Sequence, residues 1–306
     1  MKKIVIIGSS GFLGLNLTLK LSNNYKIFPI INKKKINIKN IKFIYLDLKK
    51  DKLIFKFLNK IKPDYLINCV AFSDVEKCET KKKYTLETNT NLAHRFAKIC
   101  NKLNIHYIFV SSDHIFSGRK IFYKEIDDTN PINIYAKSKV LAEEKIKKYC
   151  KKYLILRTNF YGFGPKFRTS SLVDKIIKNF KNNSEVNLLN DVNFTPIHID
   201  QLVNILLNLL ENAKIGVFNI ASNQRLTKYQ FGLKIAKKFG FKTNLLRKLY
   251  LKDIKKNVLR PKEMSLSNNK IKKIINKNSL FDLTVGISQL YKTYKSSYYK
   301  KIKKIK

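Results

Sequence analysis

Three side chains in this sequence have the types and spacing needed for acid–base chemistry at a carbonyl group: Ser112, Tyr135 and Lys139. A phenol with a pKa near 10 is a poor proton donor or acceptor at neutral pH. Tyr135 and Lys139 lie four residues apart, so a helix would place them on one face, where an ammonium group favours the phenolate. Lowering the pKa of Tyr135 by about three units would need roughly 4 kcal/mol of differential stabilisation. The hydroxyl of Ser112 would hydrogen-bond a substrate carbonyl or alkoxide.

Position, rather than the motif itself, selects this tyrosine and lysine. The pattern Tyr-x-x-x-Lys occurs four times, starting at residues 45, 135, 291 and 299. Only the second copy follows shortly after a serine pair, Ser111–Ser112, that ends an apolar strand predicted at 106–110. Polar residues at the carboxyl end of a parallel strand lie where open α/β sheets bind ligands. The competing interpretation is a surface tyrosine on a helix and a serine that satisfies a strand end.

The N-terminus predicts a dinucleotide-binding loop. An uncharged run at 4–7 suits a strand buried on both faces of a parallel sheet, and a helix is expected at 16–22. Gly8, Gly11 and Gly14 lie between them, where they would allow a tight turn, a close approach to a pyrophosphate and close packing of the helix. The phosphates would bind at the positive end of the helix dipole. The candidate contacts in this loop are Gly8, Ser10, Gly11, Phe12, Leu13 and Gly14.

The residues after the other strands complete the expected cofactor site. The strand at 26–31 ends in Asn32 and three lysines, without the acid that usually bonds the ribose 2′-hydroxyl of NAD. Lys33 and Lys34 would suit the 2′-phosphate of NADP, so NADP(H) is preferred over NAD(H), although a lysine triplet is common in so basic a chain. Lys139 would also hold the nicotinamide ribose, and the positive nicotinamide ring would favour the phenolate of Tyr135. Further candidate contacts are Asp47 and Leu48 at the adenine edge, Val70 and Ala71 beneath the cofactor, and Asn89 on a helix expected at 85–101.

The net charge of +42 does not by itself indicate nucleic-acid binding. Lysine and arginine total 63 residues against 21 acidic ones, but the lysines are spread along the whole chain and arginine occurs only seven times. Proteins that recognise nucleic acids favour arginine for its bidentate hydrogen bonding. The richness in isoleucine and asparagine is typical of an A/T-rich genome. We therefore expect a solvated, compositionally biased surface and no nucleic-acid partner.

Cysteine usage and hydropathy favour the cytoplasm. Cys69, Cys78, Cys100 and Cys150 are widely separated, without a Cys-x-x-Cys pair or a histidine cluster, so we expect reduced thiols and no metal site. The apolar stretch after Met1 is too short for a signal peptide, and no run approaches the length of a membrane span.

The order of predicted elements indicates an α/β fold with a doubly wound parallel Rossmann sheet and a smaller, interleaved C-terminal substrate-binding lobe. We expect the NAD(P)-binding domain at 1–160, with a segment near 195–222 returning to its sheet through a strand at 216–221. The smaller lobe would cover 161–290, with a last helix near 280–294, and a basic tail would occupy 291–306.

These segments resemble extended short-chain dehydrogenases/reductases, and within them the dTDP-4-dehydrorhamnose reductases and their sugar-nucleotide-binding relatives. The resemblance covers nearly the whole chain. It implies a catalytic set at Ser112, Tyr135 and Lys139, NAD(P)H as hydride donor and a nucleotide-linked 4-keto-6-deoxysugar as substrate, for surface polysaccharide synthesis. The segments that carry it are 63–77, Val110-Ser-Ser-Asp-His-Ile-Phe-Ser-Gly118, Ile134-Tyr-Ala-Lys-Ser-Lys139, Leu156-Arg-Thr158 and Arg260-Pro261.

Departures from the family pattern keep two alternatives open. His114 occupies a position where these reductases usually have tyrosine and related 4,6-dehydratases have glutamate, which argues against dehydration. A sugar-nucleotide epimerase of the same superfamily would usually keep an acid after the second strand, where Asn32 lies. The other alternative is a non-catalytic NADP-binding regulatory subunit, which the intact catalytic set disfavours.

The expected substrate contacts are Ser112, Asp113, Arg168 and Arg260, with Lys262 as a less specific further cation for the diphosphate. Arginine is scarce in this chain, so each retained one has a higher chance of a geometric role, although for Arg157 a structural salt bridge is at least as favoured. The segment 160–170 matches the rhamnose enzymes poorly, so the sugar stays open. A homodimer is also left open.

The tail from Tyr291 to Lys306 contains several lysines and tyrosines and no acid. Such a segment can contact an anionic membrane surface weakly, since clustered lysines contribute about 1 kcal/mol each there. A frayed, solvated helix end is the simpler interpretation, and we prefer it.

Overall fold

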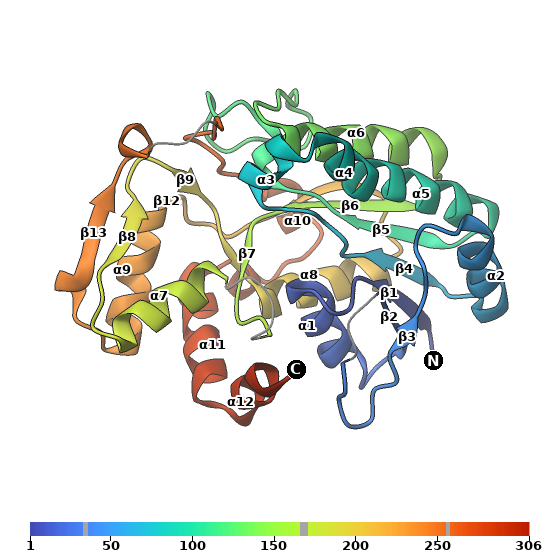
Figure 1. The fold of residues 1–306 in the computed structure, drawn as a ribbon, viewed down its shortest axis with the longest axis horizontal. Helices are drawn as coiled ribbons and strands as arrows, with labels where there is room; N and C mark the ends of the chain where they lie inside the picture. The colour runs from blue at the N-terminus through green and yellow to red at the C-terminus, as the bar shows by residue number, and fades with distance from the viewer. Residues whose placement is uncertain (33–35, 166–170, 255–257, 306) are drawn as a thin grey trace.

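A seven-stranded, fully parallel sheet forms the centre of the larger lobe (Figure 1). The computed structural model describes residues 1–32, 36–165, 171–254 and 258–305. The strand order is β11-β6-β5-β4-β1-β2-β3. This is the doubly wound order, in which the chain adds strands on one side of β1 and then on the other. The predicted fold class is therefore confirmed. The strands are β1 Lys3–Ile7, β2 Lys26–Ile31, β3 Ile44–Tyr45, β4 Tyr65–Asn68, β5 His106–Val110, β6 Tyr153–Thr158 and β11 Gly216–Ile220.

Helices cover both faces of this sheet (Figure 1). Along β1, Ile4 and Ile6 join the core that contains α1 and α8, whereas Val5 and Ile7 join the core that contains α2, α5 and α6. All four side chains are fully buried, as the uncharged run predicted. The helices on these faces are α1 Phe12–Leu21, α8 Ile199–Glu211 and α10 Asn269–Lys272 on one side, and α2 Asp51–Ile61, α5 Leu92–Lys102 and α6 Ile134–Tyr149 on the other.

The smaller lobe has its own core, built from three amphipathic helices and a short parallel pair of strands. These elements are α7 Leu172–Lys181, α9 Lys228–Phe239, α11 Leu283–Lys295, β8 Val186–Leu189 and β13 Leu246–Leu249. Two further strand pairs join this lobe to the sheet: β7 Phe160–Tyr161 with β10 Ile197–His198, and β9 Asn193–Phe194 with β12 Leu226–Thr227. β11 returns to the main sheet within this stretch of sequence, and the division at residue 160 stays a prediction.

The remaining elements are short. They are α3 Val75–Thr80, α4 Lys82–Leu86, a π-helical turn at Glu87–Asn91, and the 3-10 turns Asp113–Ile115, Thr243–Leu245, Leu251–Asp253 and Asn278–Leu280. The single helix expected at 85–101 is thus interrupted. The wider turn lets Asn89 and Thr90, both buried, reach α6 by hydrogen bonds to Ser138.

The C-terminal tail is folded, so the preferred interpretation of a frayed end is wrong. Ser297–Lys304 forms α12, whose Ile302 is fully buried. The Tyr298 hydroxyl donates to Asn16 Oδ1 of α1 at 3.0 Å, and the Lys303 ammonium donates to Asp174 of α7 at 2.6 Å. The physical reason is helical spacing, since the tyrosines and isoleucines of this segment gather on the side that packs against the protein.

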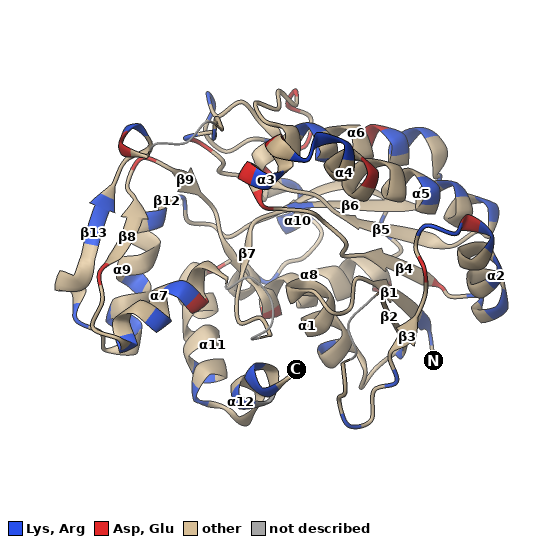
Figure 2. Ribbon diagram, viewed as in Figure 1, with Lys and Arg blue, Asp and Glu red and all other residues tan. Residues whose placement is uncertain are grey.

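Basic side chains are distributed over both lobes (Figure 2). Within the described ranges, no helix is long and apolar enough to cross a membrane.

Candidate active site

The glycine loop after β1 has the shape of a phosphate cradle. Gly8 has a φ of +82°, which turns the chain out of the strand, and a Cβ on Gly14 would lie 2.3 Å from the Gly8 carbonyl oxygen. Gly11 is the N-cap of α1 and no side chain caps that helix, so its first N–H groups are left for an anion. Ser10, Phe12 and Leu13 lie in or beside this turn. The loop therefore fits the pyrophosphate of a dinucleotide.

The other expected cofactor residues lie at the same edge of the sheet or close to it. The side chain of Val70, after β4, lies directly against Gly8, and Ala71 follows it at an exposed position. Asp47 is exposed, whereas Leu48 is buried in the sheet core. Lys33, with its neighbour Lys34, lies outside the described residues.

Asn89 holds the backbone of the loop after β4. Its Oδ1 accepts from the Phe72 amide at 2.8 Å, and its two amide hydrogens reach the Phe72 carbonyl and the Ser138 hydroxyl, each at 2.9 Å. Both donors of the side chain are thus used within the chain. The side chain of Asn89 therefore positions the loop after β4, and its role as a cofactor contact stays a prediction.

Ser112, Tyr135 and Lys139 are all buried between the end of β5 and the first turns of α6. α6 begins at Ile134 because Asn133 caps it, accepting from the Ala136 amide at 2.8 Å. This cap fixes the start of the helix, which places Tyr135 in its first turn and Lys139 one turn later. The rings of His114 and Tyr135 form a T-shaped pair, with centroids 5.7 Å apart.

The expected lowering of the Tyr135 pKa is not seen. Burial raises the pKa of Tyr135 to about 12; the side chain of Ser112 works in the opposite direction, and the charge of Asp113 adds to the rise. The ammonium of Lys139 instead donates to the Val110 carbonyl at 2.8 Å and lies over the Phe109 ring. The protein's own groups therefore keep the phenol protonated at neutral pH.

Burial also sets the charge of the neighbouring groups. It lowers the pKa of Lys139 to about 8, partly opposed by the carboxylate of Glu143 one turn later on α6. It raises the pKa of Asp113 to about 6, and the hydrogen bond from Asn159 to Asp113, 2.7 Å long, opposes that rise. Burial lowers the pKa of His114 to about 3, with a further contribution from the charges of Lys228 and Arg260, so its imidazole is neutral.

Arg260 reaches this site from the C-terminal part of the chain. Its charge acts on His114, and its guanidinium forms an ion pair with Glu76 of α3. Its Nε is buried without a hydrogen-bond partner in the described part of the chain. Lys262 instead pairs with Asp191 at 3.4 Å, and Arg168 lies outside the described residues.

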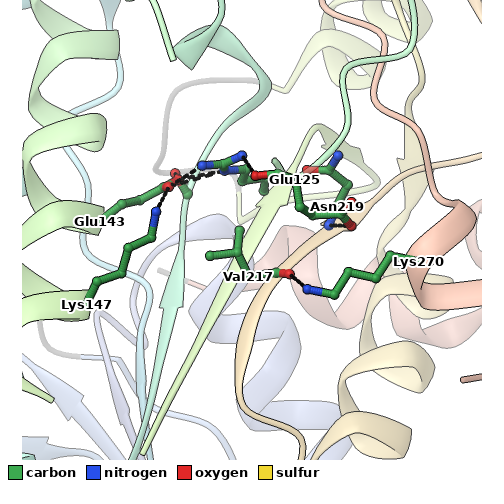
Figure 3. Close-up of polar contacts among 8 residues, drawn as sticks. Glu125, Glu143, Lys147, Val217, Asn219 and Lys270 are labelled. Carbon is green, nitrogen blue, oxygen red and sulfur yellow. Dashed lines mark hydrogen bonds and ion pairs between the residues drawn. The ribbon is translucent and has the colours of Figure 1, made fainter. Parts of the chain in front are cut away.

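A buried ion pair between β6 and α6 lies next to the site. The sequence analysis names only one of its two members, Arg157. Arg157 on β6 donates to Glu143 on α6 at 2.7 Å and to the Glu125 carbonyl at 3.1 Å (Figure 3). Ser111 donates to the same Glu143 carboxylate at 2.6 Å. The Glu125 carboxylate in turn accepts from the Asn219 amide of β11 at 2.9 Å. The spacing of Lys139 and Glu143, one helical turn, is the signal that could have revealed Glu143.

Comparison with known proteins identifies the family of this chain. A model of the RmlD substrate binding domain family matches residues 1–294. The chain belongs to the RmlD substrate binding domain family. The predicted resemblance to dTDP-4-dehydrorhamnose reductase-like extended short-chain dehydrogenases is thereby confirmed.

Relatives within and around the RmlD family differ in their described roles. The probable low-salt glycan biosynthesis reductase Agl14 of Haloferax volcanii is 28% identical over 225 residues, 72% of this chain and 75% of that protein. Methionine adenosyltransferase 2 subunit beta of Rattus norvegicus is 23% identical over 256 residues, 80% of this chain and 75% of that protein. The dTDP-4-dehydrorhamnose reductase of Bacillus anthracis, solved in complex with NADP, has a TM-score of 0.83 at 23% identity, covering 95% of this chain and 99% of that one. This last likeness shows a shared fold.

Proposed function

We propose that this protein is an NADPH-dependent reductase of a nucleotide-activated 4-keto-6-deoxysugar, acting in surface polysaccharide synthesis. The observation that carries the proposal is the burial of Ser112 and Tyr135 together at the sheet edge that also holds the glycine cradle. Membership of the RmlD family and a glycan biosynthesis reductase among the relatives support the substrate class. The expected cytoplasmic location and the open question of a homodimer stay predictions.

The chain's own residues suit the acid half of a reduction. NADPH, when bound on the Gly8–Gly14 cradle, supplies the hydride. The Tyr135 phenol, with a pKa of about 12, is protonated at neutral pH and can donate its proton to the carbonyl oxygen as that oxygen gains charge. The Ser112 hydroxyl would hydrogen-bond the same oxygen and hold it in line. Lys139, mostly charged at pH 7, would offer its further N–H donors to ribose hydroxyls.

Incubation with NADPH and a 4-keto-6-deoxy nucleotide sugar should lower the absorbance at 340 nm. Replacing Tyr135 with Phe should reduce this rate by at least about 100-fold, because the proton donor is lost while the ring and its packing remain. Retention of NADPH binding in the variant is the control. An undiminished rate would remove Tyr135 from the mechanism.

Two alternatives have distinct outcomes in the same assay. A non-catalytic binding subunit would bind NADPH without consuming it, and the rat relative is named a subunit of methionine adenosyltransferase. An epimerase would convert the sugar nucleotide with no net change in cofactor. The buried Ser112–Tyr135–Lys139 set favours the reductase over the binding subunit, because each group has a role in a net reduction. Asn32, which follows β2 where an epimerase usually keeps an acid, favours the reductase over the epimerase.

The preference for NADPH depends on the lysines after β2. We expect the Lys33→Ala/Lys34→Ala variant to weaken NADPH binding by about 10-fold more than NADH binding, because only NADPH carries a 2′-phosphate. Fluorescence titration with both cofactors measures this difference. Equal losses for both cofactors would show that the two lysines are ordinary surface charge.

Recognition of the substrate's diphosphate is assigned to Arg260 and Arg168, with Asp113 near the sugar. For Arg260 the support is its charge beside His114 and its unpartnered Nε. The guanidinium of Arg260 now pairs with Glu76, and a substrate phosphate could take the place of that carboxylate. The guanidinium would then stay paired, which its low exposure requires.

A further inference from the structure

A cavity of about 520 Å³ lies between α7 and the C-terminal helix α12. Five lysines line it, Lys178 and Lys181 from α7 and Lys300, Lys303 and Lys304 from α12. Figure 2 shows the basic segments of both helices. None of the described residues that line this cavity belongs to the Ser112–Tyr135 site. Its size is within the range of small-ligand sites.

The charges around this cavity are not balanced by the described part of the protein. Asp174 is the one carboxylate in its described lining, and that carboxylate already pairs with Lys303 at 2.6 Å and caps α7 through Ser171. No described acid forms an ion pair with Lys178, Lys300 or Lys304. Like charges that face one cavity repel one another, so an anion between them would lower the energy.

The tail lysines are held in place rather than left on a free end. Besides Asp174, the Lys303 ammonium binds the Gly164 carbonyl at 2.8 Å. The rings of Tyr299 and Phe163 form a T-shaped pair, with centroids 4.7 Å apart. These contacts fix α12 beside α7, so the lysines of both helices stay around one cavity. A ligand would therefore bind there without the entropy cost of ordering the tail.

We propose that this cavity binds a soluble ligand that carries a diphosphate group. Lysine binds phosphate as a compact point charge, and a diphosphate carries enough negative charge to engage lysines from both helices at once. The Tyr299 side chain in the lining provides an apolar wall for whatever the diphosphate is attached to.

The test uses the full chain and inorganic pyrophosphate in a calorimetric titration, with saturating NADP⁺ to keep pyrophosphate off the glycine loop. The Lys178→Ala/Lys304→Ala variant should bind pyrophosphate at least about 10-fold more weakly. The matched control is Lys56→Ala/Lys60→Ala, which removes the same charge from exposed positions on α2 and should change the affinity less than about twofold. Equal weakening in both variants would overturn the proposal.

Two further measurements keep the result specific. The Lys178→Arg/Lys304→Arg variant keeps the charge and should restore binding, and failure to do so in a protein with the parent's thermal unfolding would count against the site. Sedimentation with phosphatidylglycerol vesicles tests a lipid headgroup as the source of phosphate. Vesicle binding that depends on Lys178 and Lys304, without pyrophosphate binding, would overturn the soluble ligand. If the protein does not bind NADP⁺, the variants still report on the cavity, because all of them keep the glycine loop.

Discussion

Two consecutive serines at the end of β5 have opposite tasks. Ser111 donates to the buried carboxylate of Glu143, which also receives Arg157. Ser112 points toward Asp113 and Tyr135, where the pKa values of both neighbours are shifted. Successive residues of an extended chain face opposite sides, so one strand end serves both a support and a reactive site. The buried carboxylate of Glu143 in the support is paired with Arg157, whereas the buried carboxyl group of Asp113 in the site has no such charged partner among the described ion pairs.

The same division recurs on α6, one turn apart. Among the described residues, Ser111 and Arg157 donate hydrogen bonds to Glu143, whereas the ammonium of Lys139 meets a backbone carbonyl and an aromatic face. Burial lowers the pKa of Lys139, and the carboxylate of Glu143 partly opposes that fall. The support therefore acts on the site through charge as well as through position, and variants can separate the two effects.

The largest expected effect comes from breaking the support. Replacing Arg157 with Met should lower the free energy of unfolding by about 3–5 kcal/mol, because Glu143 would be left as an uncompensated buried charge. Urea denaturation followed by circular dichroism measures this loss. The control is the Arg157→Met/Glu143→Gln double variant, which should recover much of the stability since neither charge remains. A single variant as stable as the parent would mean that the ion pair is not a support.

The next effect compares the two serines directly. Ser112→Ala should lower the reductase rate by about 10²–10³-fold with little change in stability, because it removes a hydrogen bond to the developing alkoxide. Ser111→Ala should cost about 1–3 kcal/mol of stability, because the Glu143 carboxylate loses a buried donor, while the rate of the folded protein changes little. Steady-state kinetics and thermal unfolding on both variants check this. Equal losses of rate and of stability in the two variants would contradict the division of tasks between the two serines.

Local chemistry is what the sequence allowed us to predict. Gly8 and Gly14 were predictable because a turn and a close approach each demand glycine at a fixed distance from a strand. Tyr135 and Lys139 were predictable from helical spacing next to a strand end. The pairing of Arg157 with Glu143 was harder, because it joins a strand to a helix and depends on the three-dimensional packing between them.

Other features depended on packing that spacing does not reveal. The sequence predicts a fall in the pKa of Tyr135 from the charge of Lys139 together with that of the nicotinamide ring, whereas among the protein's own groups burial dominates and raises it. The folding of the tail required knowing that Asn16 of α1 and Asp174 of α7 lie where α12 can reach them. Asn89 is predicted as a cofactor contact, but its spacing in the sequence does not reveal that its side chain bonds the backbone of Phe72.

The last prediction uses pH to distinguish a site carboxylate from a paired one. Asp113 has its pKa raised by burial to about 6, so the folded state binds its proton more tightly than the unfolded state does. The stability from this group is fully present below pH 3.8 and is lost as the pH rises to about 6. Replacing Asp113 with Asn removes that dependence. Between pH 3.8 and pH 7, the variant should therefore gain about 2–3 kcal/mol of unfolding free energy relative to the parent.

Asp127 is the matched control because its shift has the opposite sign. Burial alone would raise its pKa, but hydrogen bonds from Lys120 and from the Lys124 amide outweigh burial and lower it. The stability from Asp127 is present above its unfolded pKa and is lost as the pH falls, so Asp127→Asn should be more harmful at pH 7 than in acid. Unfolding of the parent and both variants by urea across this pH range measures the two slopes. If the Asp113 and Asp127 variants change with pH in the same direction, Asp113 is held in its charged form like a paired surface carboxylate, and the contrast between a site carboxylate and a paired one fails.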